Sequence, residues 1–94
     1  MAEWQDIGDG DLFFLDVGFG IQLVVQFEGP GAVSDESNPD NQWAGHLEFY
    51  EEQVADIPMM CLGSNKLDVL QGMMVDAYLE FTRQLHENAK ELPR

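Results

Sequence analysis

The strongest structural signal in this 94-residue chain is the helical periodicity of its last third. From residue 65 onward, apolar side chains recur at three- and four-residue steps, which places them on one side of an α-helix. They are Leu67, Leu70, Met74, Ala77, Tyr78, Phe81, Leu85, Ala89 and Leu92. Ser64 or Asn65 is expected to cap the helix start, and Asp68 would complete a capping box. The pattern predicts a helix of about 25 residues that ends near Pro93 and needs a partner for its apolar side.

The first half of the chain supplies a surface that such a helix can cover. Residues 12–17 and 21–28 are rich in β-branched and aromatic side chains and alternate between inward and outward positions, as half-buried strands do. The segment Gly18-Phe19-Gly20 between them has the length and glycine content of a tight hairpin turn. We therefore predict an antiparallel pair of strands.

Residues 43–50 alternate in the same way and predict a third strand. Its expected inward side chains are Leu47 and Phe49, and its outward ones are His46, Glu48 and Tyr50. Residues 51–57 are expected to form one short helical turn before Pro58, and residues 59–62 either a brief fourth strand or an extended connector.

Together these elements predict an α+β fold, a small antiparallel sheet of three or four strands packed on one long C-terminal helix in the order βββα. The length fits a single domain over residues 1–94. Within it, residues 29–42 concentrate Gly, Pro, Ser, Asn and Asp and contain almost no side chain that could anchor in a core. We expect this segment to be a flexible acidic loop.

Negative charge is segregated along the sequence. Eighteen Asp and Glu stand against four Lys and Arg, which gives a formal net charge of −14. Residues 1–65 contain thirteen of the acidic residues and no Lys or Arg, whereas the remaining 29 residues are nearly balanced. Uncompensated like charge opposes folding, so this distribution favours a role in binding. Direct binding to nucleic acid or to an anionic membrane is disfavoured, and a charged partner should be basic.

We expect the carboxylates of the first 65 residues to gather into one continuous anionic surface that imitates a polynucleotide backbone. Its best candidates for contacts to Lys and Arg of a partner are Asp35, Glu36, Asp40, Glu48, Glu51 and Glu52. An interface also needs apolar or aromatic anchors, for which the candidates are Trp4, Trp43, Phe14 and Tyr50. The alternative is that the acidity reflects adaptation to high salt, which would not obviously leave the helical segment balanced.

A second surface is predicted on the helix. Val75 and Leu79 lie off the main apolar stripe, and Gly72 is near them on the helical wheel. Either the loop before the helix folds over this patch, or the patch is a contact with a second copy or a partner, since a glycine allows close approach.

No group of residues indicates a catalytic reaction. Asp6, Asp9 and Asp11 suggest a calcium loop, but Phe13 stands where an EF-hand pattern needs its third ligand. His46 and His86 are expected to be ordinary surface residues, and Cys61 is expected in the core because its neighbours are apolar. We therefore predict a protein that is not an enzyme and uses no metal or cofactor.

The composition also bears on location. The first fifteen residues carry no Lys or Arg, whereas a secretory signal begins with positive charge, and every apolar run is far shorter than a membrane span. A single cysteine cannot form an internal disulfide. These features predict a cytoplasmic protein.

In size, charge and lack of catalytic motifs the chain resembles the small acidic inhibitors that phages and mobile elements use against host enzymes, including DNA mimics, anti-restriction proteins and anti-CRISPR proteins. The resemblance implies a stoichiometric inhibitor that occupies the DNA- or RNA-binding surface of a host defence complex. An immunity or antitoxin protein that neutralises a cationic nuclease remains an alternative, as does a viral assembly protein.

Overall fold

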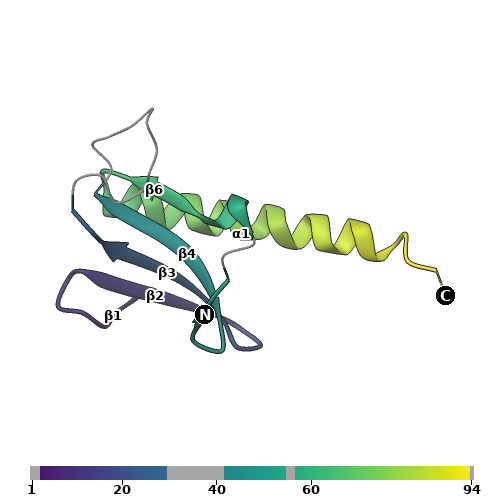
Figure 1. Cartoon of the computed structure of the whole chain (residues 1–94), viewed down its shortest axis with the longest axis horizontal. Helices are drawn as coiled ribbons and strands as arrows, with labels where there is room; N and C mark the ends of the chain where they lie inside the picture. The colour runs from purple at the N-terminus through teal and green to yellow at the C-terminus, as the bar shows by residue number, and fades with distance from the viewer. Residues whose placement is uncertain (1–2, 30–41, 55–56, 94) are drawn as a thin grey trace.

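The computed structural model describes residues 3–29, 42–54 and 57–93 and has the predicted α+β architecture. An antiparallel sheet forms one layer, and a single long helix packs across one of its faces (Figure 1). Within the described residues the sheet has six strands, more than the three or four that the sequence predicts. No helix among these residues combines the length and apolar character needed to cross a membrane.

The elements in chain order are β1 (Gln5–Asp6), β2 (Leu12–Gly18), β3 (Ile21–Phe27), β4 (Trp43–Phe49), β5 (Glu52–Gln53), the 3₁₀ helix η1 (Pro58–Met60), β6 (Leu62–Ser64) and α1 (Leu67–Ala89). Strands β1 to β4 lie side by side in sequence order, and β5 and β6 pair with opposite ends of β4. The long strands and the hairpin between β2 and β3 are confirmed.

The short elements differ from the prediction. Strands β1 and β5 are two residues each, and neither was predicted. The helical turn predicted for residues 51–57 is wrong, because Tyr50 and Glu51 instead form a tight turn that leads into β5. Of the two alternatives for residues 59–62, the strand is partly right. A 3₁₀ turn comes first, and β6 begins only at Leu62.

The start of α1 also differs from the predicted capping box. The N-cap residue is Lys66, and no side chain caps the helix. Ser64 is used differently, since its Oγ accepts a hydrogen bond from the Lys66 backbone N–H at 3.2 Å. Asp68 lies in the first turn, where a carboxylate interacts favourably with the positive end of the helix dipole.

The core lies between the helix and the adjoining strands. It consists of Leu15, Leu23, Val25, Leu47, Met60, Leu70 and Met74, all buried. Gly45 in β4 allows the close approach of α1, because a Cβ at this position would lie 2.5 Å from the Met74 Sδ. Cys61, predicted to be in the core, is instead exposed.

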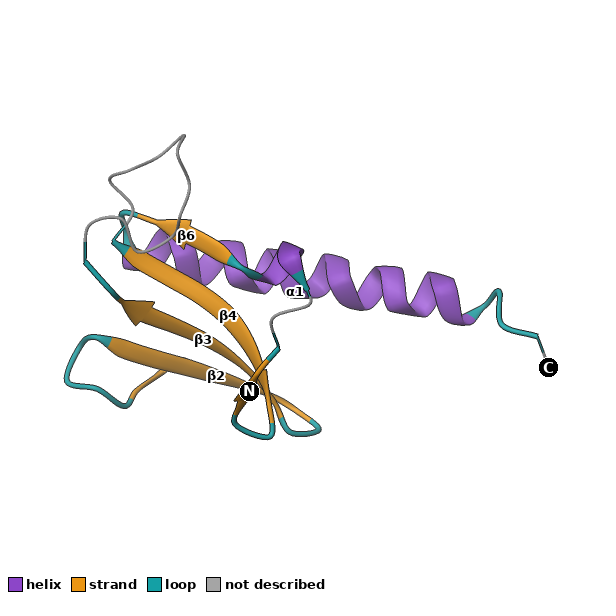
Figure 2. Cartoon of the chain, viewed as in Figure 1, coloured by secondary structure: helices purple, strands orange, loops and turns teal. Residues whose placement is uncertain are grey.

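The helix is longer than the sheet that it covers. Its apolar stripe is buried at Leu70 and Met74 and half-buried as far as Phe81, but Leu85 is 52% exposed. Residues 83–93 are all exposed, and Figure 2 shows this part of the chain extending past the strands. The periodicity therefore identifies the apolar side of the helix correctly but overstates how much of it is covered.

The predicted acidic loop lies almost entirely outside the described residues. Its two ends are described and are joined, because the backbone N–H groups of Glu28 and Gly29 both donate to the Gln42 carbonyl, at 2.9 and 3.2 Å. The candidate contacts Asp35, Glu36 and Asp40 also lie outside the described residues.

Candidate partner-binding surface

The face of the sheet that α1 leaves uncovered carries a polar row near one end. Successive side chains of a strand point to opposite faces, and Leu23, Val25 and Leu47 point toward the helix. The residues between them therefore face away from it. The strand register aligns four such residues across β2, β3, β4 and β5, namely Asp16, Gln22, Glu48 and Gln53.

Two hairpin turns border this row. Phe19-Gly20 joins β2 to β3, and Tyr50-Glu51 joins β4 to β5; all four residues have positive φ, as a type I′ turn requires. Such angles are uncommon for large side chains, so Tyr50 and Glu51 hold a strained conformation at φ 51° and 69°. The Tyr50 backbone N–H donates to the Gly20 carbonyl at 2.7 Å, which ties the two turns together. We call this the turn end of the sheet.

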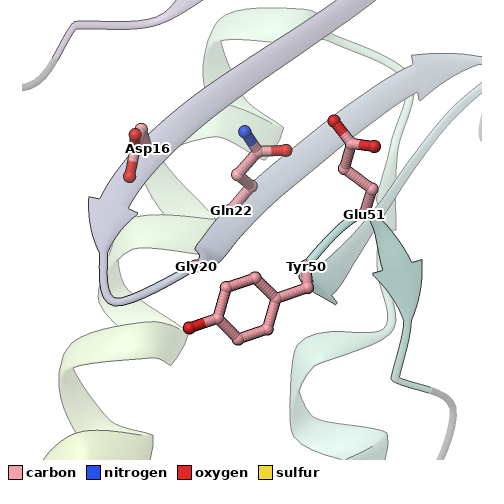
Figure 3. Close-up of a pocket in the computed structure, with 5 residues that line it drawn as sticks. All are labelled: Asp16, Gly20, Gln22, Tyr50 and Glu51. Carbon is pink, nitrogen blue, oxygen red and sulfur yellow. The ribbon is translucent and has the colours of Figure 1, made fainter.

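A pocket lies at the turn end. It has a volume of about 320 Å³ and is lined by Asp16, Gly20, Gln22, Tyr50 and Glu51. Figure 3 shows the Gln22 side chain between those of Asp16 and Glu51, with the Tyr50 ring across Gly20. The lining thus combines two carboxylates, one amide and one aromatic ring from two strands, β2 and β3, and two turns.

The carboxylates at the turn end have no Lys or Arg to neutralise them among the described residues. Residues 3–65 contain neither. His46 is the one basic side chain in the described sheet, and its Nε2 lies 2.7 Å from the Glu48 Oε2. His46 was predicted to be an ordinary surface residue, but its side chain is only 15% exposed.

The ion pairs that the described Lys and Arg residues make are with carboxylates of the helix segment itself. Arg83 makes two hydrogen bonds to Glu80, from Nε at 2.9 Å and from Nη2 at 2.5 Å. These bonds, with a smaller contribution from Gln84, lower the pKa of Glu80 from 4.5 to about 2. Lys90 lies 3.5 Å from Glu87. None of these pairs involves a carboxylate of the sheet.

The expectation of one continuous anionic surface needs correction. The described carboxylates of the sheet form two groups at opposite ends of its strands. Asp6, Asp9, Asp11 and Glu28 lie at the end where β1 turns into β2, and Asp16, Glu48, Glu51 and Glu52 lie at the turn end. Between the two groups, the register places Phe14, Val24 and His46 in a less charged row.

The group at the β1–β2 loop is organised by its own backbone. The Asp6 Oδ1 accepts hydrogen bonds from the N–H groups of Gly8 and Gly10, at 3.1 and 2.9 Å. No group of three or more His, Cys, Asp or Glu in the described part of the chain is arranged to hold a metal ion.

The predicted anchors and contacts do not all come together. Glu48, Tyr50, Glu51 and Glu52 lie at the turn end, but Glu52 pairs with Phe49 in the register, which places it on the other face of the sheet from Glu48. Trp43 is at the far end of β4 on the helix side, half-buried beside Phe27 with ring centroids 5.2 Å apart.

Exposed aromatic side chains gather at the turn end as well. Phe19 is 92% exposed and Tyr50 is 69% exposed, and the Phe49 and Tyr50 rings meet edge to face with centroids 4.5 Å apart. Sequence reasoning missed Phe19, Asp16 and Gln22 as site residues. Only the strand register, which pairs Asp16 with Gln22 and Gln22 with Glu48, brings these positions together.

The second predicted surface is only partly exposed. Gly72 is exposed and no atom lies within 4 Å of where its Cβ would be, and Leu79 is 59% exposed. Val75, however, is half-buried and packs against the core cluster. This patch is therefore smaller than the sequence suggests.

No protein-family model, no curated protein and no solved structure matches this chain. The residues and their arrangement therefore carry the functional argument alone.

Proposed function

We propose that this protein is a stoichiometric inhibitor whose turn end docks on the basic, nucleic-acid-binding surface of a host defence complex of the anti-CRISPR or anti-restriction type. The observation that carries the proposal is the turn end itself. It presents Asp16, Glu48 and Glu51, with Glu52 on the opposite face of the same end, in a sheet that has no described Lys or Arg, beside the exposed rings of Phe19 and Tyr50.

The combination fits a protein interface better than an active site. Exposed carboxylates attract a basic surface and raise the rate of encounter, while exposed aromatic rings supply the apolar contact area that holds a complex together. General acid-base chemistry needs a carboxylate with a displaced pKa. Among the described carboxylates the large shift belongs to Glu80, which lies on the helix and does not line the pocket, and hydrogen bonds from Arg83 explain it.

The pattern of pairing argues against acidity that serves solubility alone. Ordinary surfaces intersperse both signs of charge, as α1 does through Arg83 with Glu80 and Lys90 with Glu87. The sheet contains no such pairs among its described Asp and Glu residues apart from the contact of Glu48 with His46. The carboxylates at the turn end therefore repel one another, and a basic partner would reduce this repulsion.

The test is affinity capture from a bacterial lysate with a matched pair of triple variants. The site variant, Asp16→Asn with Glu51→Gln and Glu52→Gln, removes three exposed charges at the turn end. The control, Asp76→Asn with Glu87→Gln and Glu91→Gln, removes three exposed charges from the helix segment. Both variants have the same net charge, so any difference between them reports where the charge lies.

We expect the unmodified protein and the control to retain a nucleic-acid-binding complex that the site variant loses. Raising the salt from about 0.15 to about 1 M shortens the Debye length from ~8 to ~3 Å and should elute that complex. The captured complex should then release a labelled DNA or RNA probe when the protein is added. Equal retention by both variants would contradict the proposal, and capture of a cationic nuclease toxin would favour an immunity protein instead.

A further inference from the structure

We propose that the pocket at the turn end is a receptor for one guanidinium group, that of an arginine side chain. The inference rests on the proposed function for the source of the arginine, which is the basic partner. It adds a specific recognition site to a general electrostatic attraction, and it names the chemistry that fills the pocket.

The arrangement of charges in the pocket suits a planar cation. The carboxylates of Asp16 and Glu51 stand on either side of the Gln22 side chain (Figure 3). A guanidinium carries five N–H donors in a rigid fork, so it can donate to two carboxylates at once. The amide oxygen of Gln22 can accept a further N–H. The Asp16 Oδ1 already accepts the Gly18 backbone N–H at 2.8 Å, which fixes the orientation of this carboxylate.

The aromatic wall adds a second, independent kind of contact. Tyr50 lines the pocket with its ring and is 69% exposed, so part of the ring is accessible to a ligand. Arginine stacks on aromatic rings through cation–π attraction, which acts within about 6 Å of the ring centroid. The ring lies close against Gly20, since a Cβ on Gly20 would be only 2.6 Å from it.

The size of the pocket selects among ligands. A volume of about 320 Å³ is at the lower limit of small-molecule sites, which run from about 300 to 1,000 Å³. It accommodates one side chain rather than a nucleotide cofactor. Two carboxylates in the lining repel a phosphate or carboxylate ligand. A lysine ammonium could pair with a carboxylate, but it lacks the planar fork with which a guanidinium donates along two edges while its face stacks on a ring.

The experiment is a titration followed by NMR, with Nα-acetyl-arginine methylamide as the probe. The lysine analogue and tetramethylammonium chloride serve as comparisons at equal ionic strength. We expect saturable shifts of the Gln22 side-chain amide, the Gly20 backbone amide and the Tyr50 ring. The arginine probe should bind more tightly than the lysine probe, and tetramethylammonium should give no saturable shift.

Three variants test the assignment of the site. Glu51→Gln and Asp16→Asn should each weaken binding of the arginine probe by about tenfold, the value of one charge-assisted hydrogen bond. Tyr50→Leu should weaken it severalfold and reduce the preference for arginine over lysine. The control Glu87→Gln should bind as the unmodified protein does. One-dimensional spectra of each variant confirm that it is folded.

The outcomes separate this inference from the proposed function. Shifts that do not saturate, or equal binding of the lysine probe, would overturn the arginine receptor even if the lysate capture succeeds. Saturable binding with no salt-sensitive capture would support a guanidinium site and remove the nucleic-acid-binding partner. A last comparison decides whether the occupant is a protein side chain or a free guanidinium compound. It sets a peptide that contains one arginine against free arginine and agmatine. Tighter binding of either free compound would overturn a partner's side chain as the occupant.

Discussion

The ring of Tyr50 lies against the backbone of Gly20 so closely that a methyl group on Gly20 would come within 2.6–2.9 Å of three ring carbons. Together with the hydrogen bond from the Tyr50 N–H to the Gly20 carbonyl, this contact joins the two hairpin turns. It also sets one wall of the pocket, since both residues line it. The arrangement of the turn end therefore depends on the Tyr50 ring packing against a residue that has no side chain.

The first prediction concerns this fit. Gly20→Ala should lower the free energy of unfolding by about 2–4 kcal/mol, because it adds overpacking against Tyr50 to the strain of a positive φ. Gly18→Ala is the matched control. Gly18 has φ 93° but no neighbour within 4 Å of its Cβ position, so only the strain of about 1–2 kcal/mol applies. Urea unfolding measures both, and equal losses would show that the ring moves aside freely.

The second prediction links stability to binding. Glu51 has φ 69°, which a glycine adopts without strain, so Glu51→Gly should raise the free energy of unfolding by about 0.5–1 kcal/mol. The same change removes a carboxylate from the pocket and should weaken arginine binding by about tenfold, as Glu51→Gln does. Glu52→Gly, at an adjacent exposed position with ordinary strand geometry, should destabilise slightly. Urea unfolding and the NMR titration test the two effects separately.

The third prediction concerns the contact between the sheet and the helix. Gly45→Ala should cost about 1–3 kcal/mol, because its methyl group would overlap the Met74 side chain. Met74→Ala should cost about 2–5 kcal/mol through the cavity that it leaves. In the double variant the added methyl group fills part of that cavity, so the combined loss should be smaller than the sum by about 1 kcal/mol or more. Additive losses in urea unfolding would contradict this packing.

The fourth prediction is a pH dependence of the helix. The pKa of Glu80 is lowered from 4.5 to about 2 by hydrogen bonds from Arg83. A lowered pKa stabilises the folded form fully above pH 4.5, and this contribution is lost as the pH falls through about 2. Arg83→Ala should therefore return the pKa of Glu80 toward 4.5, and helix content should fall at a higher pH than in the unmodified protein. NMR titration of the Glu80 carboxyl carbon and circular dichroism measure the two effects. Arg83→Lys should restore part of the shift.

The fifth prediction distinguishes the covered and uncovered parts of the helix. Phe81 is half-buried and packs against the core, whereas Leu85, one turn later on the same stripe, is 52% exposed. Phe81→Ala should cost about 2 kcal/mol, and Leu85→Ala less than about 0.5 kcal/mol. A large loss of unfolding free energy on Leu85→Ala at low protein concentration would contradict this prediction, because it would mean that Leu85 is buried in solution.

The long elements could be predicted from the sequence because each one repeats the same spacing of apolar residues several times. Alternation over seven residues defines β3, and three- and four-residue steps define α1. Periodicity does not show how far a partner surface extends. A seven-residue strand spans about 23 Å and a 23-residue helix about 35 Å, so the end of the stripe has no sheet beneath it.

The candidate site could be predicted only in part. Glu48, Tyr50 and Glu51 stood out as charged or aromatic side chains near the end of a predicted strand, but Asp16 and Gln22 did not. Their place in the pocket depends on the register between strands, which no single segment specifies. The Tyr50-Glu51 turn was missed because neither residue favours a positive φ, so local propensity argued against a turn there.

The uncovered end of α1 has a practical consequence for following the protein in solution. Leu92 is 67% exposed and follows α1, whose C-terminal part extends past the sheet (Figure 1). Because Cys61 is the single thiol, Cys61→Ser with Leu92→Cys gives one attachment point for a fluorophore. A dye whose own rotation is restricted at this position would report complex formation through slower tumbling, and Leu92 does not line the pocket at the turn end.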